Sequence, residues 1–272
     1  DVAVLCVGLS SEWDSEGQDR PHMDLPGRQN ELIARVAAAN PRTVVLLQTG
    51  GPVTMPWLAD AAAVVQAWYP GQEAGNAIAD VLFGAVNPSG KLPQTFPARL
   101  EDNPAYGNYP GENGKVTYGE GIFVGYRHYD RQQNAPLFPF GFGLSYTTFE
   151  YSNLRMKPGR FDLNEVICVS VDVTNTGARP GQEIVQFYVR DPEARVERPE
   201  KELKGFTKVA LAPGQCATVT VQLDRRALAF WDVEAHAWAA EAGAFNVLVG
   251  SSSHDIHLRG SFRLSDTVVF EA

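Results

Sequence analysis

The sequence predicts two fold classes in succession, an α/β part and then an antiparallel β-sandwich. In the first part, short apolar runs alternate with amphipathic stretches of helical period, which is typical of strands joined by helices. From Phe149 onward, apolar and polar residues alternate with a period of two, as in a sheet with one buried face. The length of 272 residues is compatible with two domains.

The first part begins with the apolar run Val2–Leu9, which indicates a buried strand. A helix is expected over Gly27–Ala39, where Leu32, Ile33 and Val36 share one face. The other expected elements are a strand over Thr43–Leu47, a short helix over Trp57–Ala62, a strand over Ala63–Trp68 and a helix over Gln72–Phe83. Single helices between strands imply parallel neighbours. Because few strands are visible and the chain starts at Asp1 inside a strand, we expect an N-terminal part to be missing.

The segment from Gly84 to Tyr146 breaks this pattern. It is rich in glycine, proline, asparagine and aromatic residues, and its many aromatic side chains argue against disorder. We interpret it as an ordered wrap between two domains. The alternative is that it forms the wall of a binding pocket, because aromatic faces suit sugar rings.

The second part predicts about seven short strands, as in an antiparallel β-sandwich. Within Val166–Thr174, the apolar residues Ile167, Val169, Val171 and Val173 alternate with polar ones. The other expected strands are Gln182–Arg190, Leu203–Ala210, Ala217–Leu223, Ala227–Trp231, Ala242–Gly250 and Ile256–Leu264. Trp231 and Trp238 flank a small connection and are expected to pack at its edge. A structural or interaction role is favoured for this half.

Composition excludes some classes of partner. The net charge is −9 and no basic tract occurs, which argues against binding to nucleic acid or to a membrane surface. Neither a membrane-spanning run nor a signal peptide is visible in the sequence, and the compartment stays undetermined. Cys6, Cys168 and Cys216 lack zinc-ligand or redox spacing; a Cys168–Cys216 disulfide requires their strands to pair, and free thiols are favoured. His254 and His257 give only a weak metal signal.

An acidic loop follows the first strand. It carries five carboxylates, namely Glu12, Asp14, Glu16, Asp19 and Asp24. Ligands of open α/β sheets bind where loops leave the carboxyl ends of strands. The cluster is therefore a candidate for general acid/base chemistry. The alternative is a solvated acidic loop.

Several long stretches resemble one family. They are EGQDRPHMDLPGRQNELI, VVLLQTGGPVTMPWL, AWYPGQEAGNAIADVLFGAVNPSGKLPQTFP, YGEGIFVGYRHYD and FPFGFGLSYTTFEYS. In order, they resemble the C-terminal half of glycoside hydrolase family 3 enzymes, above all β-glucosidases with an inserted PA14 domain. The resemblance implies part of an α/β sandwich domain over residues 1–125, a linker over 126–148 and a fibronectin type III-like β-sandwich over 149–272.

The resemblance also implies how catalysis is divided. An N-terminal (β/α)8 barrel supplies an aspartate nucleophile, usually in an SDW-like motif, and this sequence has neither; its nearest string is the reversed Trp231-Asp232. The second domain supplies the acid/base glutamate from a loop after a strand. Glu12 is the expected residue and Glu16 is the alternative, because some members carry it in a shorter Gly-Glu-Gly loop. Asp19 and Arg20 are expected to form an ion pair that fixes the loop.

The resulting hypothesis is a part of a retaining β-glycosidase that acts on terminal β-D-glucosyl residues. It requires no metal or cofactor, and its implied partners are the β-glucoside and the barrel of the same enzyme; a homo-oligomer is left open. Without the nucleophile, this chain alone is expected to be inactive. A β-xylosidase or a glycosidase of natural-product sugars is the alternative within the class. A non-catalytic carbohydrate-binding or adhesion module is the alternative from another class.

Overall fold

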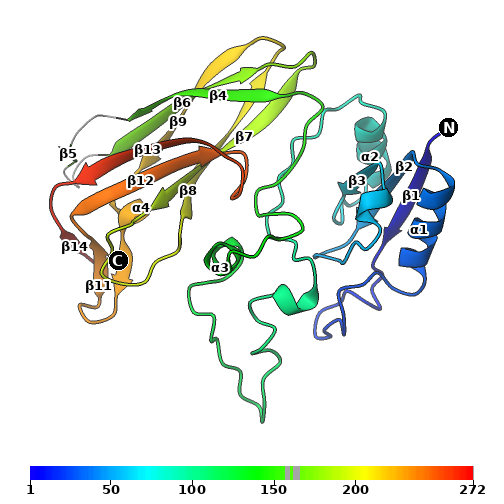
Figure 1. Ribbon diagram of the computed structural model, residues 1–272, viewed down its shortest axis with the longest axis horizontal. Coiled ribbons are helices and arrows are strands. Elements are labelled where there is room, and N and C mark those ends of the chain that lie inside the picture. The colour runs from blue at the N-terminus through cyan, green and yellow to red at the C-terminus, as the bar shows by residue number, and fades with distance from the viewer. Residues whose placement is uncertain (157–159, 162–165, 272) are drawn as a thin grey trace. The chain divides into compact units, whose positions relative to one another are not determined.

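The computed structural model describes residues 1–156, 160–161 and 166–271 (Figure 1). The chain divides into two compact units. The first consists of Asp1–Val86 and Phe96–Thr117, and the second of Asn87–Thr95 and Tyr118–Ala272. The segment that breaks the strand–helix pattern thus contributes residues to both units. None of the described helices is long and apolar enough to cross a membrane.

The first unit is a parallel sheet with helices, as the sequence predicts. Its strands are β1 (Ala3–Gly8), β2 (Thr43–Gln48) and β3 (Ala63–Gln66), which pair in parallel in the order β1-β2-β3. Its helices are α1 (Gln29–Ala39) and α2 (Ala74–Leu82), with the 3₁₀ turns η1 (Leu58–Asp60) and η2 (Leu100–Asp102). The short helix expected near residue 60 is present as the single turn η1.

Burial in β2 and α1 follows the apolar residues of these elements. The middle strand β2 buries Val45, Leu46 and Leu47 almost completely, in keeping with its continuous apolar run. Helix α1 buries Ile33 and Ala37, which lie four residues apart on one face. Two expectations are wrong: β1 is not a buried strand, since Val4 is 47% exposed and Cys6 is exposed at the edge of the described sheet, and Leu32 of α1 is 48% exposed.

At the outer edge of β1, a glutamine side chain bonds to the backbone of the last residue of the strand. The N–H of Leu9 donates to the carbonyl of Gln48 on β2. Alternate residues of a parallel strand bond to opposite sides, so the polar groups of Gly8 face the outer edge. There the Oε1 atom of Gln29 accepts the Gly8 N–H at 2.8 Å, and its Nε2 donates to the Gly8 carbonyl at 3.0 Å. The side-chain amide completes the hydrogen bonds that a further strand would make at this residue.

The helix α3 (Tyr126–Gln132) was not predicted from the sequence. Its sequence, YRHYDRQ, has no apolar period. The helix begins after Gly125 at φ 55° and ends at Gln133 in the left-handed conformation, and only Tyr129 is buried. Its limits are therefore set by backbone conformations at both ends and by one aromatic anchor.

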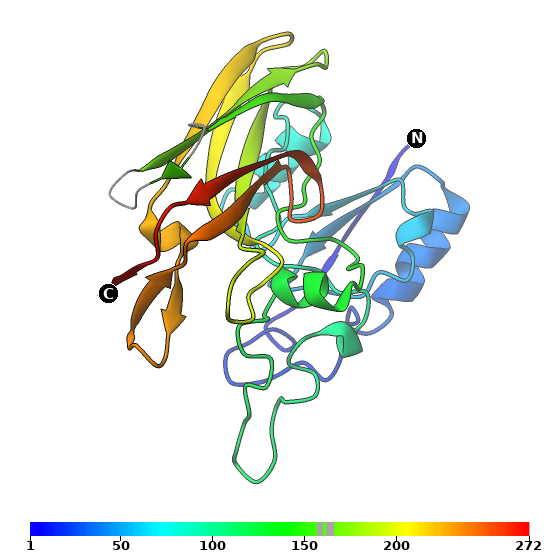
Figure 2. The same cartoon turned by 60° about the vertical axis from the view of Figure 1, so that its left-hand side comes forward.

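The second unit is a β-sandwich, which confirms the predicted fold class (Figures 1 and 2). One sheet has the order β5-β13-β12-β7-β8 and the other β4-β6-β9; a small sheet has the order β10-β11-β14. The strands are β4 (Phe149–Met156), β5 (Arg160–Phe161), β6 (Ile167–Asn175), β7 (Gly181–Arg190), β8 (Glu202–Leu211), β9 (Cys216–Leu223), β10 (Phe230–Asp232), β11 (Ala237–Ala240), β12 (Gly243–Gly250), β13 (Ile256–Leu264) and β14 (Val268–Phe270). Pairing is antiparallel except between β5 and β13.

Alternating residues fill the core of this sandwich. Strand β6 buries Ile167, Val169, Val171 and Val173, and β7 buries three apolar residues that the period of two placed on one face. They are Val185, Phe187 and Val189. The rings of Trp231 and Trp238 lie 5.6 Å apart on paired strands, which confirms their packing.

The strand predicted over Ala227–Trp231 is wrong in its first half. A short helix, α4 (Arg225–Leu228), occupies it, and β10 begins only at Phe230. The carboxylate of Asp224 accepts the backbone N–H of Ala227 at 3.0 Å and caps the helix. An N-cap of this kind stabilises the first turn and outweighs the strand pattern.

The cysteines are free thiols. Strands β6 and β9 do pair, but their register places Cys168 opposite Gln222 and Cys216 opposite Thr174. All three cysteines lack a disulfide partner in the described chain. The preference for free thiols is therefore confirmed.

Truncation of a core aromatic should destabilise the sandwich. Phe187 is fully buried, so Phe187→Ala should lower the free energy of unfolding by about 3–5 kcal/mol. Phe206 on neighbouring β8 is 66% exposed, and Phe206→Ala should cost less than about 0.5 kcal/mol. Urea unfolding followed by circular dichroism measures both, and equal losses would contradict the described core.

The acid stability of the sandwich should depend on Asp172. Hydrogen bonds from Arg155, Thr218 and Asn153 hold the pKa of this carboxyl well below its usual range. A lowered folded-state pKa stabilises the fold above the unfolded value of about 3.9, and this stabilisation is lost as the pH falls. Asp172→Asn should therefore lower the melting temperature at pH 7, with a deficit that shrinks below pH about 4. Glu150→Gln, an exposed change on β4, is the control and should show no such pH trend.

Candidate active site

The acidic loop leaves the carboxyl end of β1 as a tight turn. The carbonyl of Ser10 accepts the backbone N–H groups of Trp13 at 2.9 Å and Asp14 at 3.0 Å. This turn places Ser11 and Glu12 at its tip. The first residues after the strand are thus held in one backbone conformation.

Asp14 connects the loops that follow all three strands. Its Oδ2 atom accepts the hydroxyl of Tyr69 at 2.6 Å and the N–H of Gly50 at 3.2 Å. Gly50 follows β2, and Tyr69 follows β3. Burial first, and then the bond to Asp14, raises the pKa of Tyr69, so its hydroxyl remains a donor at neutral pH.

Gly50 is required at this junction for reasons of space. A Cβ atom there would lie 2.5 Å from Oδ2 of Asp14 and 2.9 Å from the ring of Tyr69. Real side chains do not approach this closely, so any larger residue would displace the carboxylate. The hydrogen bonds of Asp14 therefore depend on the glycine.

The second half of the loop is a small hairpin. Ser15 and Gln18 form an antiparallel bridge, and Glu16 and Gly17 lie at its tip with Gly17 at φ 81°. The two residues that follow the hairpin anchor it to the rest of the unit. Asp19 accepts a hydrogen bond from the hydroxyl of Tyr109, and Arg20 donates to the carbonyl of Pro52 at 3.0 Å.

The expected ion pair between Asp19 and Arg20 is wrong. Within the described part of the chain, the two side chains bond to Tyr109 and Pro52 instead of to each other. The loop is fixed as expected, but by a tyrosine hydroxyl and a backbone carbonyl.

The five acidic residues fall into two groups. Asp14, Asp19 and Asp24 are bound within the fold, the last by the hydroxyl of Thr54. Glu12 and Glu16 are exposed and make no hydrogen bond or ion pair with any residue that the structure describes. The structure thus brings two free carboxylates to the tips of two neighbouring turns in one anchored loop.

The base of the loop is polar and closely packed. The rings of Trp13 and His22 lie 5.5 Å apart. Nη1 of Arg20 and Nδ1 of His22 are buried and have no hydrogen-bond partner among the described residues. Both atoms therefore have unused capacity to bind a polar group.

Sequence reasoning missed the residues that anchor this loop. Gly50, Tyr69 and Tyr109 lie far along the chain from the carboxylates that they bind. A signal was available for the first two, because both directly follow a strand and the carboxyl ends of parallel strands meet at one edge of a sheet. Tyr109 lies in the irregular segment and gave no such signal.

The other candidates form no site. The ring of His257 stacks on Tyr151 at 4.3 Å, and its Nε2 lies 3.1 Å from Asp255. Asp232, from the reversed Trp-Asp string, pairs with Arg195. No group of three or more His, Cys, Asp or Glu side chains in the described chain could hold a metal ion.

Comparison with protein families assigns the first part of the chain. The model described as the glycosyl hydrolase family 3 C-terminal domain matches residues 1–146, which is more than half of the chain. The chain belongs to glycosyl hydrolase family 3. A fibronectin type III-like domain matches residues 183–253 of this family 3 chain, within the β-sandwich.

The similar proteins are β-glucosidases by name. The chain is 52% identical to a β-glucosidase of Rhizobium radiobacter over all of its own length, and 52% identical to thermostable β-glucosidase B of Acetivibrio thermocellus over 98%. It covers 34% and 36% of these relatives. A structure of a β-glucosidase from Kluyveromyces marxianus in complex with glucose superimposes with a TM-score of 0.93 at 49% identity, over 98% of this chain and 32% of that one. The family 3 chain thus spans about a third of the length of its relatives.

Removal of one hydroxyl should loosen the loop. Tyr69→Phe deletes the 2.6 Å bond to Asp14, at an expected cost of about 1 kcal/mol because the bond is partly exposed. Exchange of the backbone amides of residues 12–20 should accelerate about fivefold. Hydrogen–deuterium exchange read by mass spectrometry checks this, with Tyr106→Phe as the matched control on an exposed ring of the same unit. Unchanged exchange in Tyr69→Phe would show that Asp14 does not hold the loop.

Proposed function

We propose that this chain is the part of a retaining β-glycosidase that supplies the general acid/base for hydrolysis of terminal β-D-glucosyl residues. The observation that carries the proposal is the pair of free glutamates, Glu12 and Glu16, in an anchored loop at the carboxyl ends of parallel strands. Membership of family 3 and the names of the relatives support a glucoside as the substrate, rather than a xyloside. The K. marxianus structure with glucose agrees with this choice.

The reaction needs two carboxyl groups. One attacks the anomeric carbon, and the other protonates the leaving-group oxygen and then deprotonates the attacking water; in retaining enzymes they lie about 5–5.5 Å apart. We propose that the loop glutamate is the second of these, and that the nucleophilic aspartate belongs to an N-terminal (β/α)8 barrel of the same enzyme. The share of about a third of the relatives' length is consistent with such a partner.

Either glutamate could fill this role. Glu12 directly follows the turn at the end of β1 and precedes Trp13, whose half-buried ring could shield a carboxyl from water. Glu16 lies in a bridged hairpin whose flanking residues are fixed by Tyr69, Tyr109 and Pro52. A catalytic group needs such a pre-organised position. On this structural ground Glu16 is the stronger of the two, and Glu12, which the sequence favoured, is the alternative.

The domain limits at residues 125 and 148 belong to the same proposal. The match to the family 3 domain ends at residue 146 and the fibronectin type III-like match begins at residue 183, which supports the limit near residue 148; the limit at residue 125 lies inside the family 3 match. The compact units divide the chain differently, since residues 87–95 pack with the β-sandwich.

Replacement of each glutamate in the complete enzyme tests the catalytic role. The Ala variant at the acid/base position should lose about 10²–10⁴ in kcat on alkyl glucosides, since protonation of the leaving group contributes that much. The loss should be smaller on 2,4-dinitrophenyl β-glucoside, whose leaving group needs no proton. On the dinitrophenyl glucoside, azide should restore turnover and yield β-glucosyl azide, because it attacks the glycosyl-enzyme in place of the water that the base would activate.

The controls separate the two positions. Glu12→Ala, Glu16→Ala and their Gln counterparts are compared with Glu31→Gln, an exposed glutamate of α1 that should leave kcat unchanged. Azide rescue in only one of the two Ala variants identifies the acid/base. If both Ala variants keep full activity on alkyl glucosides, the loop does not supply this group.

A further inference from the structure

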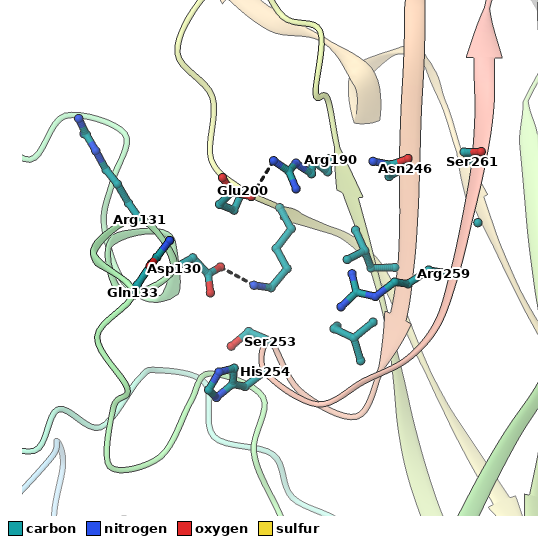
Figure 3. A pocket seen from close by; sticks show the side chains of 14 residues that line it. Asp130, Arg131, Gln133, Arg190, Glu200, Asn246, Ser253, His254, Arg259 and Ser261 are labelled. Carbon is teal, nitrogen blue, oxygen red and sulfur yellow. Dashed lines mark hydrogen bonds and ion pairs between the residues drawn. The ribbon is translucent and has the colours of Figure 1, made fainter.

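A polar hollow of about 740 Å³ lies within the second unit (Figure 3). It is formed by helix α3, strands β7, β12 and β13, and the loops that follow β7 and β12. Ligand pockets commonly have volumes of about 300–1,000 Å³, so a short oligosaccharide fits by size.

Two ion pairs neutralise most of the charge in this hollow. Nζ of Lys201 lies 2.6 Å from Oδ2 of Asp130, and Arg190 lies 3.0 Å from Glu200. Figure 3 shows Asp130, Arg190 and Glu200 facing the hollow, whereas Arg131 points away from it. The guanidinium of Arg131 pairs with Glu197 at 2.8 Å.

Arg259 is the cation that remains. Figure 3 shows its guanidinium directed into the hollow. The guanidinium makes no hydrogen bond or ion pair with any residue that the structure describes, whereas the backbone of Arg259 pairs with β12. Arg259 is an exposed residue of β13, and its positive charge gives this hollow a local attraction for an anion although the chain as a whole carries a net charge of −9. The planar fork of a guanidinium matches a carboxylate in particular.

The rest of the lining suits a sugar ring. Asn246, Ser261 and Gln133 offer neutral donors and acceptors, and Leu248 and Ile256 offer an apolar surface. Ring hydroxyls can bond to the amides and hydroxyls while the C–H face of a ring packs on the aliphatic side chains. A mixed lining of this kind is typical of sites for small polar ligands.

The wall beneath these residues is braced. In the loop after β12, the hydroxyl of Ser252 accepts the N–H groups of His254 and Asp255, and the N–H of Ser253 donates to the carbonyl of Phe140. The amide of Gln186 donates to the carbonyl of Ser251 at 2.6 Å. Hydrogen bonds within the fold therefore hold the loop that borders the hollow in place.

A second hollow continues from the first. Its volume is about 280 Å³, and it shares Asp130, Gln133, Ser253 and His254 with the larger one. It is also lined by Thr95, whose buried hydroxyl has no hydrogen-bond partner among the described residues. A buried hydroxyl that lacks a partner is costly, so this atom is placed to bond to a ligand hydroxyl.

We propose that this pair of hollows in the fibronectin type III-like unit binds a saccharide that carries a carboxylate, such as a uronic acid residue, with Arg259 as the carboxylate anchor. The proposal concerns binding by the second unit and does not depend on the proposed acid/base loop.

The test compares two probes that differ only in the carboxylate. Methyl β-D-glucuronide and methyl β-D-glucoside are titrated into the complete protein by calorimetry and by ligand-observed NMR. The glucuronide should bind at least about tenfold more tightly, as expected for a hydrogen bond between charged groups. Its affinity should fall in 0.5 M NaCl, because the site is open to solvent.

The matched variants are Arg259→Gln and Arg263→Gln. Both arginines are exposed and lie on β13, but Arg263 does not line the hollow. Arg259→Gln should lose the preference for the glucuronide and retain its melting temperature, whereas Arg263→Gln should bind as the parent does. Equal affinity of the two sugars, absent glucuronide binding, or unchanged binding in Arg259→Gln would overturn the proposal. Competition by acetate as effective as by the glucuronide would overturn the saccharide part of it.

Discussion

The carboxylate of Asp14 is the contact on which the geometry of the first unit depends. It joins the loop after β1 to the loops after β2 and β3 through Gly50 and Tyr69. Parallel strands deliver their loops to one edge of the sheet, but they do not by themselves hold those loops together. The carboxylate of Asp14 holds the three loops together because it accepts one hydrogen bond from each of the other two. The loop that carries Glu12 and Glu16 is anchored in this way.

The strands of both units could be predicted because burial imposes a period on the sequence. The middle of strand β2, residues 44–47, is continuously apolar because it is buried on both sides, and β6 alternates because one face is buried. Helix α3 could not be predicted in this way. Its residues follow no apolar period, and its ends depend on the backbone conformations of Gly125 and Gln133. At α4, a local cap at Asp224 replaced the strand that an apolar run suggested.

The sequence singles out the candidate loop but not the contacts that hold it. Carboxylates that follow a strand of an α/β unit point to the loop, and the resemblance to family 3 points to a glutamate within it. Which carboxylates are tied down depends on partners distant in the chain, such as Tyr109 for Asp19. The spacing of residues in the sequence does not contain that information. For this reason an ion pair between the neighbours Asp19 and Arg20 was expected, and it is not formed.

The side-chain amide of Gln29 has a consequence for how the sheet can grow. A chain that extends the sheet along β1 can use the outward polar groups of Val4 and Cys6, but at Gly8 it meets positions that Gln29 already fills. The amide therefore acts as a stop that sets the register of any added strand. It also keeps such a strand from running on into the turn that presents Glu12.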